Sequence, residues 1–394
     1  MKLYDIAVIG AGPTGSRVAY RLAGMGYGVV VIEQKDGLEE PVCCTGIISR
    51  ECVESFDIEE SIIYRWVNSA RLLSPSGNLL SVWRQEPQAA IIDRVAFNVS
   101  LASRAKSEGA EYVLSSRVRS LKVDDDRVRI EAVRQGERSG FEARVAVITT
   151  GFTPRLTAEL GFGIVGDFVM GAQAQVETVG IDEVEVYCGQ EIAPAFFGWL
   201  VPTSPQKALV GLLSRRTPRP YLEKLVSSLL AAGKIASNEV EARYGGIPLK
   251  PLRRTCSDRI LVVGTAAGQV KPTTGGGIYF GLLCADIAAS TLRIALETDD
   301  LSAGRLAGYE RNWRRKLGRE LRTGYWARKF YERLSDRQVD RIFDIIKSSG
   351  IDEALLKSDD LTFDWHGKVL SRLPGVVWRR AFSRAAGLIK NPFR

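Results

Sequence analysis

The stretch that decides the fold is Leu3–Gln34, "LYDIAVIGAGPTGSRVAYRLAGMGYGVVVIEQ". Its apolar run Leu3–Ile9 is typical of a β-strand that is buried on both faces. Gly10, Gly12 and Gly15 follow in GxGxxG spacing. Such glycines permit a tight turn, let a pyrophosphate approach the backbone, and allow the next helix to pack closely on the strand.

A helix and a second strand follow the glycines. Ser16–Met25 has the helical spacing of small apolar residues, and Gly28–Ile32 is a second apolar run. This run ends in Glu33, whose carboxylate can accept a hydrogen bond from an adenosine ribose. Since strand, glycines, helix, strand and acid occur in this order within one βαβ unit, the segment predicts a dinucleotide-binding α/β fold.

A second glycine-rich block lies far downstream, at Asp258–Ser290. It has the pattern of a strand, Ile260–Val263, then a glycine turn and a helix that begins near Gly277. Helix N-termini present unpaired N–H groups to anions or to the electron-rich edge of a ring. Two such segments favour FAD over NAD, because the isoalloxazine ring needs its own binding site. The alternative is a second, unrelated βα unit.

With these motifs the chain resembles the FAD-dependent geranylgeranyl reductase family over roughly residues 1–300. The resemblance rests on the N-terminal motif with Glu33, on "PVCCTG" at Pro41–Gly46, on Arg94 in "IIDRVAF", and on "GTAAGQVKPTTGGGI" at Gly264–Ile278. A further stretch, "PAFFGWLVP" at Pro194–Pro202, is similar to the lipid-cavity motif of that family.

The resemblance implies a set of site residues. The walls of a substrate cavity would be Phe196, Phe197 and Trp199, although the aromatic side chains could equally be ordinary core residues. Arg94 would reach FAD, with a surface ion pair as the alternative. The implied cofactor-binding residues are Gly10, Gly12, Thr14, Gly15, Glu33, Cys44, Thr45, Gly46, Arg94, Val118, Thr265, Gly276, Gly277 and Ile278.

Two positions depart from the family pattern. Thr265 follows Gly264 where the family has aspartate, and Thr150 stands where the family has the aspartate of Ala-Asp-Gly. A threonine hydroxyl still accepts a hydrogen bond, but without the added strength of a charged acceptor. Both substitutions therefore bear on how tightly a flavin is held.

Cys43 and Cys44 are adjacent, which raises three alternatives for this pair. A disulfide between neighbours would close a strained ring, and a metal would need further ligands, while the one histidine, His366, is distant in sequence and is expected to be structural. The pair could also act as small buried hydrophobes. The resemblance implies instead that Cys44 lies at the flavin ring as a catalytic residue, and no metal site is expected.

The predicted fold class is α/β. A Rossmann-type FAD-binding domain, similar to that of glutathione reductase, is expected to be discontinuous, and alternating runs such as "DEVEVYCG" predict an inserted antiparallel sheet that forms a substrate domain. The FAD-binding domain is predicted at 1–70, 90–155 and 248–300, the substrate domain at 71–89 and 156–247, and a helical, basic C-terminal region at 301–394.

Composition and charge indicate the cellular compartment in which the protein is expected. The six cysteines form no CxxC pair, there is no secretory leader, and no apolar run approaches the ~18 residues that span a bilayer, so we expect a cytoplasmic protein. The net charge is +8, and Pro374–Arg394 carries five basic and no acidic residues. This tail is either a solvated helical face or a peripheral contact with an anionic membrane. No nucleic-acid-binding motif accompanies the charge.

The expected function is reduction of carbon–carbon double bonds in a geranylgeranyl or other polyprenyl chain. Hydride would come from reduced FAD, which agrees with the lack of a Ser/His/Asp set or paired acids in the sequence. The expected partners are an isoprenoid lipid substrate and an external electron donor, either NAD(P)H or ferredoxin. The alternatives are a flavin-dependent monooxygenase or halogenase of the same fold, and a non-enzymatic flavin-binding lipid carrier or electron-transfer protein.

Overall fold

The computed structural model describes residues 2–349 and 362–367, so the basic tail at 374–394 lies outside the described residues. The chain divides into two compact units, each made of three segments. The first unit contains Met1–Val42, Arg94–Phe168 and Ile247–Leu321. The second contains Cys43–Asp93, Val169–Gly246 and Arg322–Arg394.

The first unit is built on an eight-stranded sheet whose main path has the order β17-β18-β11-β1-β2-β8. The pairs β1–β11, β1–β2, β2–β8 and β11–β18 are parallel, and β9–β10–β11 form an antiparallel extension. The strands are β1 (Leu3–Ile9), β2 (Val29–Ile32), β8 (Glu111–Val113), β9 (Ser116–Val123), β10 (Val128–Arg134), β11 (Glu137–Ile148), β17 (Cys256–Ser257) and β18 (Ile260–Val262).

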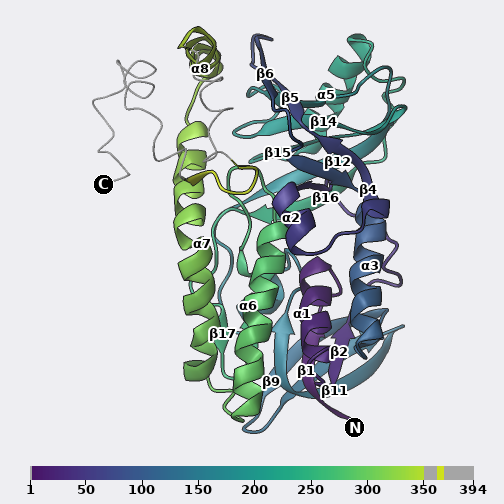
Figure 1. The fold of residues 1–394 in the computed structure, drawn as a ribbon, viewed down its shortest axis with the longest axis vertical. Coiled ribbons are helices and arrows are strands. Elements are labelled where there is room, and N and C mark those ends of the chain that lie inside the picture. Colours follow the sequence, from purple (N-terminus) through teal and green to yellow (C-terminus); the bar gives the residue numbers. More distant parts are fainter. Residues whose placement is uncertain (1, 350–361, 368–394) are drawn as a thin grey trace, which may run out of the picture. The chain divides into compact units, whose positions relative to one another are not determined.

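Both faces of this sheet are covered, as the apolar run at Leu3–Ile9 predicts. On one side α1 (Pro13–Ala23) packs against α3 (Arg94–Ser107) and α6 (Ile278–Glu297), and the three helices lie side by side in Figure 1. On the other side, Ala7 and Ile9 of β1 share a core cluster with Val128 and Ile130 of β10. The unit also contains α4 (Pro154–Glu159) and the short η2 (Gly264–Ala267).

Helix α6 is long and apolar enough, by length and composition alone, to cross a membrane, although sequence inspection found no such run. In the structure 61% of the window that meets this test is buried inside the protein. Phe280, Leu282 and Leu292 are fully inaccessible to solvent. Helix α6 therefore has the burial of a core helix of the first unit.

The second unit contains a seven-stranded sheet of order β16-β12-β15-β14-β13-β5-β6 and a three-stranded sheet of order β3-β7-β4. The predicted strand runs near residues 182–214 form β13, β14 and β15, which pair in antiparallel fashion, whereas β13 pairs with β5 in parallel. The strands are β3 (Ile47–Ser49), β4 (Ile63–Val67), β5 (Ser69–Leu73), β6 (Leu79–Trp83), β7 (Ala89–Ile92), β12 (Phe168–Glu177), β13 (Val184–Cys188), β14 (Phe197–Ser204), β15 (Lys207–Ser214) and β16 (Arg243–Pro248).

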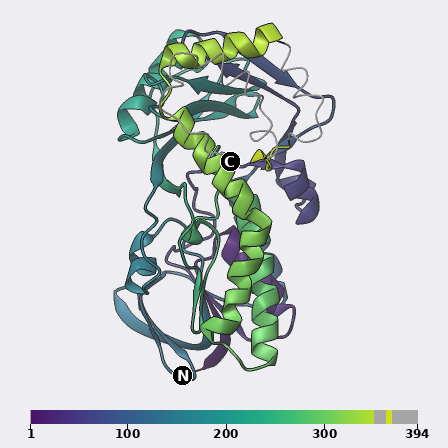
Figure 2. The same ribbon diagram turned by 90° about the vertical axis from the view of Figure 1, so that its left-hand side faces the viewer.

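Helices cover the seven-stranded sheet. Leu222, Leu225 and Leu229 of α5 (Arg219–Ala231) join the core cluster of β12, β14 and β15. Helix α8 (Asp336–Ser349) packs with Val339 and Phe343 against the strands β5 and β6 (Figure 2). The unit is completed by α2 (Arg50–Ser55), η1 (Glu60–Ile62) and the last turns of α7 (Ala303–Tyr331), a helix that begins in the first unit.

Candidate cofactor-binding site

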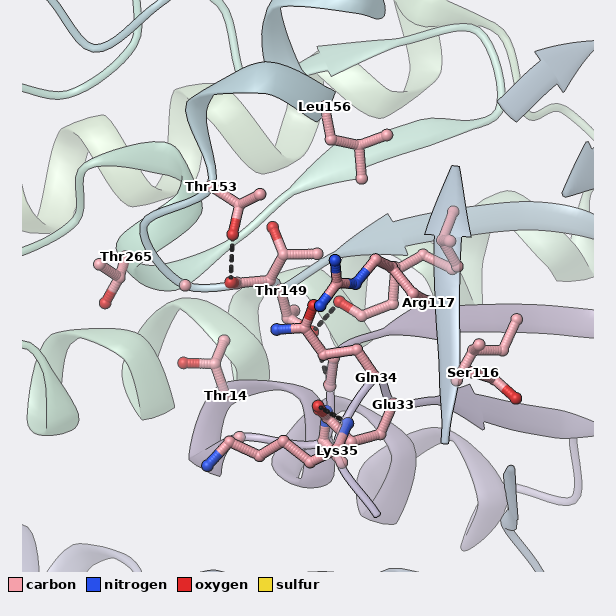
Figure 3. Close-up of a pocket in the computed structure, with 18 of the residues that line it drawn as sticks. Thr14, Glu33, Gln34, Lys35, Ser116, Arg117, Thr149, Thr153, Leu156 and Thr265 are labelled. Atoms are coloured by element: carbon pink, nitrogen blue, oxygen red, sulfur yellow. Dashed lines mark hydrogen bonds between the residues drawn. The ribbon is translucent and has the colours of Figure 1, made fainter. Parts of the chain in front are cut away.

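A cavity of about 680 Å³ opens in the first unit where β1, β2 and β11 end. Ligands of open α/β sheets bind at this carboxyl edge of the strands. The glycine loop after β1, the loop after β2, β9 and the loop after β11 all contribute to its walls. In Figure 3, Thr265 and Ser116 lie on opposite sides of the group of lining side chains, so the second glycine block and β9 contribute to different walls of the cavity.

The glycine loop has its shape for steric reasons. Gly10 has φ +108°, and a Cβ there would lie 2.7 Å from the carbonyl oxygen of Thr149. A Cβ on Gly15 would lie 2.0 Å from the Gly10 carbonyl oxygen. The Thr149 hydroxyl donates to the carbonyl oxygens of Ile9 and Gly10, each at 2.9 Å. Only glycine fits at these two positions, and the loop is thereby fixed against the end of β11.

The N-terminus of α1 is open toward a ligand. Its N-cap residue is Gly12, which makes no side-chain capping bond, and Pro13 occupies the first turn. No acidic residue lies in that turn. Because the first N–H groups of a helix have no partner within the helix, this terminus can bind an anion such as a diphosphate.

Glu33 is buried, with 8% of its surface exposed, and it holds two loops together. Its Oε2 accepts a hydrogen bond from the backbone N–H of Ala11 at 2.7 Å, and its Oε1 accepts one from Lys35 at 3.0 Å. A carboxylate oxygen has two lone pairs, so each oxygen can accept a further bond. The carboxylate can therefore order the glycine loop and also accept bonds from ribose hydroxyls.

Three polar side chains that line the cavity have buried atoms without a partner in the described part of the chain. These atoms are Nε and Nη1 of Arg94, Oδ1 of Asn98 and Oγ1 of Thr150. Buried polar groups in native proteins are almost always hydrogen-bonded. The three side chains therefore fit a ligand that offers both anionic oxygens and hydroxyl groups, and the FAD expected from sequence has both.

Asn98 was missed from sequence. It follows Arg94 by four residues on α3, so the two side chains share one face of the helix, as residues in this spacing do. The usable signal was this spacing in "DRVAFN". Val118 was named from the resemblance and lines the cavity on β9, next to Arg117.

The second glycine block forms the other end of the cavity through Thr265. It is fixed by buried hydrogen bonds: Gly264 donates its N–H to Oε1 of Gln269 at 2.7 Å, and Nε2 of Gln269 donates to the Tyr309 hydroxyl at 2.8 Å. That hydroxyl donates to the Val262 carbonyl at 3.1 Å. Helix α7, which carries Tyr309, thus holds the loop after β18 in place.

The side chain of Thr14, in the first glycine segment, packs closely against Gly264 and Gly281 of the second. A Cβ on Gly264 would lie 2.7 Å from Oγ1 of Thr14, and a Cβ on Gly281 would lie 2.5 Å from it. Gly277 is the N-cap residue of α6, which starts at Ile278, and the Gly276 carbonyl accepts the N–H of Lys271 at 2.9 Å. Thr14 lines the cavity, whereas Gly276, Gly277 and Ile278 are not among its lining residues in the described structure.

Cys44, Thr45 and Gly46 belong to the second unit and precede β3. The Cys44 carbonyl accepts a bond from Nε2 of the buried Gln173 at 3.2 Å, and the Gly46 carbonyl accepts the N–H of Ile92 at 3.0 Å. All six cysteines of the chain are free thiols. Burial, followed by the proximity of Cys44, raises the pKa of Cys43 to about 11. Among the described residues no group of three potential metal ligands occurs.

The predicted cavity aromatics lie on β14 and the turn before it. Phe196 is fully buried, and its ring centroid is 5.0 Å from that of Phe197, which is in turn 6.3 Å from the Trp199 ring. Nε1 of Trp199 is buried without a partner in the described residues. A separate, mainly apolar cavity of about 250 Å³ has Val184 and His366 in its wall. His366 Nε2 lies 3.0 Å from the Phe363 carbonyl oxygen.

Known proteins are similar to this chain in sequence and in fold. A family model described as Lycopene cyclase protein matches residues 5–352. The digeranylgeranylglycerophospholipid reductase of Methanocaldococcus jannaschii is 30% identical over 365 residues, which cover 89% of this chain and 93% of that protein. The chain belongs to this reductase family, and the resemblance drawn from sequence motifs is confirmed.

Solved structures agree with the fold of this reductase family member. A geranylgeranyl bacteriochlorophyll reductase-like protein from Thermoplasma acidophilum has a TM-score of 0.83 at 22% identity, with 98% of each chain covered. A flavin-dependent halogenase has a TM-score of 0.68 at 18% identity, covering 97% of this chain and 78% of that one. The predicted fold class, with a Rossmann-type domain, a second sheet and C-terminal helices, is confirmed.

Proposed function

We propose that this protein is an FAD-dependent oxidoreductase that reduces carbon–carbon double bonds of a geranylgeranyl chain carried by a lipid. The observation that carries the proposal is the cavity at the carboxyl edge of the sheet, with unpartnered buried atoms of Arg94, Asn98 and Thr150, in a chain of the reductase family. The unit that contains this cavity would bind the cofactor, and the unit with the seven-stranded sheet would bind the lipid.

The proposed cofactor contacts follow from the chemistry of each group. The α1 N-terminus at Gly12 and the Arg94 guanidinium would bind the diphosphate, and Glu33 would accept from the adenosine ribose. The backbone of Val118 would contact the adenine. The hydroxyls of Thr150 and Thr265 would bond the ribityl chain. Cys44, Thr45 and Gly46 are proposed as contacts of the isoalloxazine ring, on the resemblance.

The reaction needs little from the protein besides alignment and exclusion of water. Reduced FAD, when bound, supplies the hydride for one alkene carbon, and the other carbon takes a proton. Phe196, Phe197 and Trp199 would present an apolar wall to the prenyl chain. We place Cys44 beside the reacting carbons, where its thiol would shape the wall or supply a proton.

The remaining proposals concern the partners. The lipid would be an isoprenoid, reached from the cytoplasm by peripheral contact with a membrane. Electrons would come from an external donor, NAD(P)H or a ferredoxin. The halogenase-like fold supports a second candidate, a flavin-dependent monooxygenase or halogenase, which would consume oxygen.

One experiment separates these candidates. The protein is reconstituted with FAD, reduced under anaerobic conditions with dithionite and mixed with digeranylgeranylglyceryl phosphate, and the lipid is analysed by mass spectrometry. We expect two added hydrogens for each reduced double bond. An isomer of unchanged mass would indicate a cyclase, as the matching family model is described. An oxygenated or halogenated product formed only with oxygen would indicate the second candidate.

A further inference from the structure

Arg328 lies in the last turn of α7 in the second unit, and only 5% of its surface is exposed. Its guanidinium carbon is 4.1 Å from the ring centroid of Phe196 and 4.3 Å from that of Tyr331. Its Nε and Nη2 are buried without a hydrogen-bond partner in the described residues. The aromatic faces stabilise a cation, but they leave the N–H groups of Nε and Nη2 without an acceptor.

The carboxylate of Glu332, four residues after Arg328, is already paired with other cations. Glu332 accepts from Nε and Nη2 of Arg215 at 3.0 and 2.6 Å, and from Nζ of Lys329 at 3.2 Å. Burial, aided by the charge of Arg215, lowers the pKa of Arg328 to about 10, against the opposing effects of Tyr331, Glu332 and Cys188. Three cations therefore surround one carboxylate. A buried guanidinium is costly unless an anion pairs with it, so this cluster lacks a negative charge.

Arg328 is next to the predicted lipid-binding aromatics. Phe196, which stacks on it, is part of "PAFFGWLVP", and its ring is 5.0 Å from that of Phe197. A prenyl chain lying along these rings would bring its charged end to the guanidinium. The planar fork of arginine matches the oxygens of a phosphate, and both can pair through two parallel hydrogen bonds.

We propose that Arg328 binds the phosphate of the lipid substrate and thereby sets the end of the prenyl chain along the aromatic wall. The inference rests on the proposed function, since it assumes a prenyl lipid with a phosphate. Arg215 and Lys329 add positive charge around it. The phosphate could be that of a glycerophospholipid or of a prenyl diphosphate, and both have the same chemistry at this site.

The test compares ligands that differ in the phosphate alone. Dissociation constants in detergent are measured for digeranylgeranylglyceryl phosphate against digeranylgeranylglycerol, and for geranylgeranyl diphosphate against geranylgeraniol. Arg328→Met should weaken the phosphate-bearing ligand about tenfold or more, the loss expected for a charged hydrogen-bonded pair, and leave the alcohol unchanged. Arg328→Lys should lose part of the preference. Arg322→Met, an exposed arginine on the same helix, is the matched control and should bind as the wild type does.

Each outcome decides the inference. The ligand pair for which the wild type prefers the phosphate-bearing member shows whether the bound phosphate is that of a glycerophospholipid or of a prenyl diphosphate. No preference in either pair, a preference that survives in Arg328→Met, or equal weakening of alcohol and phosphate would overturn it. If Arg328→Met does not fold, the same dissociation constants are compared between the wild type and Arg328→Lys. Phosphate preference without reduction of the chain would contradict only the proposed function, and reduction without the preference would contradict only this inference.

Discussion

At the scale of single residues, Glu33 has a structural role, and we propose that it also binds the cofactor. Its carboxylate accepts hydrogen bonds from the backbone N–H groups of Ala11 and Lys35, so it orders the glycine loop between β1 and α1. We predict that Glu33→Ala weakens FAD binding by about 1–3 kcal/mol, the penalty for leaving buried donors unpaired. Titration of the apoprotein with FAD, followed by flavin fluorescence, measures the effect.

Glu137→Ala is the control for this variant, because Glu137 is an exposed carboxylate in the same unit. It should leave the FAD affinity unchanged. An FAD affinity in Glu33→Ala that equals the wild-type value would mean that Glu33 orders its loop without contributing to cofactor binding.

The adjacent thiols of Cys43 and Cys44 should differ in what they do. Cys43 is a neutral thiol whose folded-state pKa of about 11 exceeds its ordinary value of 9.0 because it is buried. The unfolded thiol ionises first as pH rises, so the stability that Cys43 contributes is complete below pH 9 and is lost toward pH 11. In Cys43→Ser the free energy of unfolding should therefore decrease less between pH 9 and pH 11 than it does in the wild type. Turnover should stay near the wild-type value.

Cys44→Ser should do the reverse: FAD stays bound, while the rate of double-bond reduction or the visible spectrum of the flavin changes. Urea unfolding at several pH values and turnover with reduced FAD are measured on both variants. Equal effects of the two substitutions on turnover, or none from either, would contradict the assignment of Cys44 to the reacting centre.

The sequence predicted residues whose role depends on backbone conformation or on a motif. It did not predict residues whose role depends on their three-dimensional environment. Gly10 and Gly15 were predicted because spacing alone encodes the turn. Asn98 and Arg328 were not predicted, since nothing in the sequence shows that their polar atoms are buried without partners. Such a property depends on the packing of distant segments, which a single sequence does not reveal.

At the scale of elements, α1 and α6 depend on glycine at their contact. Gly281 of α6 leaves room for Thr14 of α1, and a Cβ there would lie 2.5 Å from the Thr14 hydroxyl. We predict that Gly281→Ala destabilises the protein by about 1–3 kcal/mol, the usual range for overpacking a core, and weakens FAD because Thr14 lines the cavity. Thermal unfolding and FAD titration measure both effects.

The double variant Thr14→Ala/Gly281→Ala removes the clashing atoms and should recover most of the stability. Gly318→Ala in the interior of α7 is the control, because the nearest atom to its new Cβ is 3.9 Å away. Alanine in a helix interior is more favourable than glycine, so this control should be neutral or slightly stabilising. A double variant as unstable as Gly281→Ala would show that the clash is with something other than Thr14.

The order of β1, α1 and β2 followed from the sequence because βαβ units have short, regular connections. The parallel pairing of β13 with β5 did not follow from the sequence, because the two strands lie more than a hundred residues apart and neither carries a motif that specifies its neighbour. Helix α6 was predicted to begin near Gly277, but its apolar content over a membrane-spanning length was missed because Asp286 and Arg293 interrupt the apolar run.

At the scale of the whole molecule, the net charge of +8 is concentrated in part in the tail at 374–394, outside the described residues. A lipid-reducing enzyme must reach a substrate that resides in a membrane. Basic residues near an anionic membrane surface contribute about 1 kcal/mol each, and apolar side chains between them can enter the interface. The five basic residues of this tail are Arg379, Arg380, Arg384, Lys390 and Arg394.

We predict that the protein floats with vesicles that contain anionic lipid and not with neutral vesicles, and that added salt releases it, because exposed charges are screened. Changing the five tail residues to glutamine should abolish flotation while leaving FAD content intact. The control changes five basic residues that are exposed elsewhere and should keep binding: Lys122, Arg134, Arg138, Lys207 and Arg322. If both five-residue variants lose binding equally, the attraction reflects net charge alone and the tail has no special role. If neither loses it, apolar contact rather than charge brings the protein to the membrane.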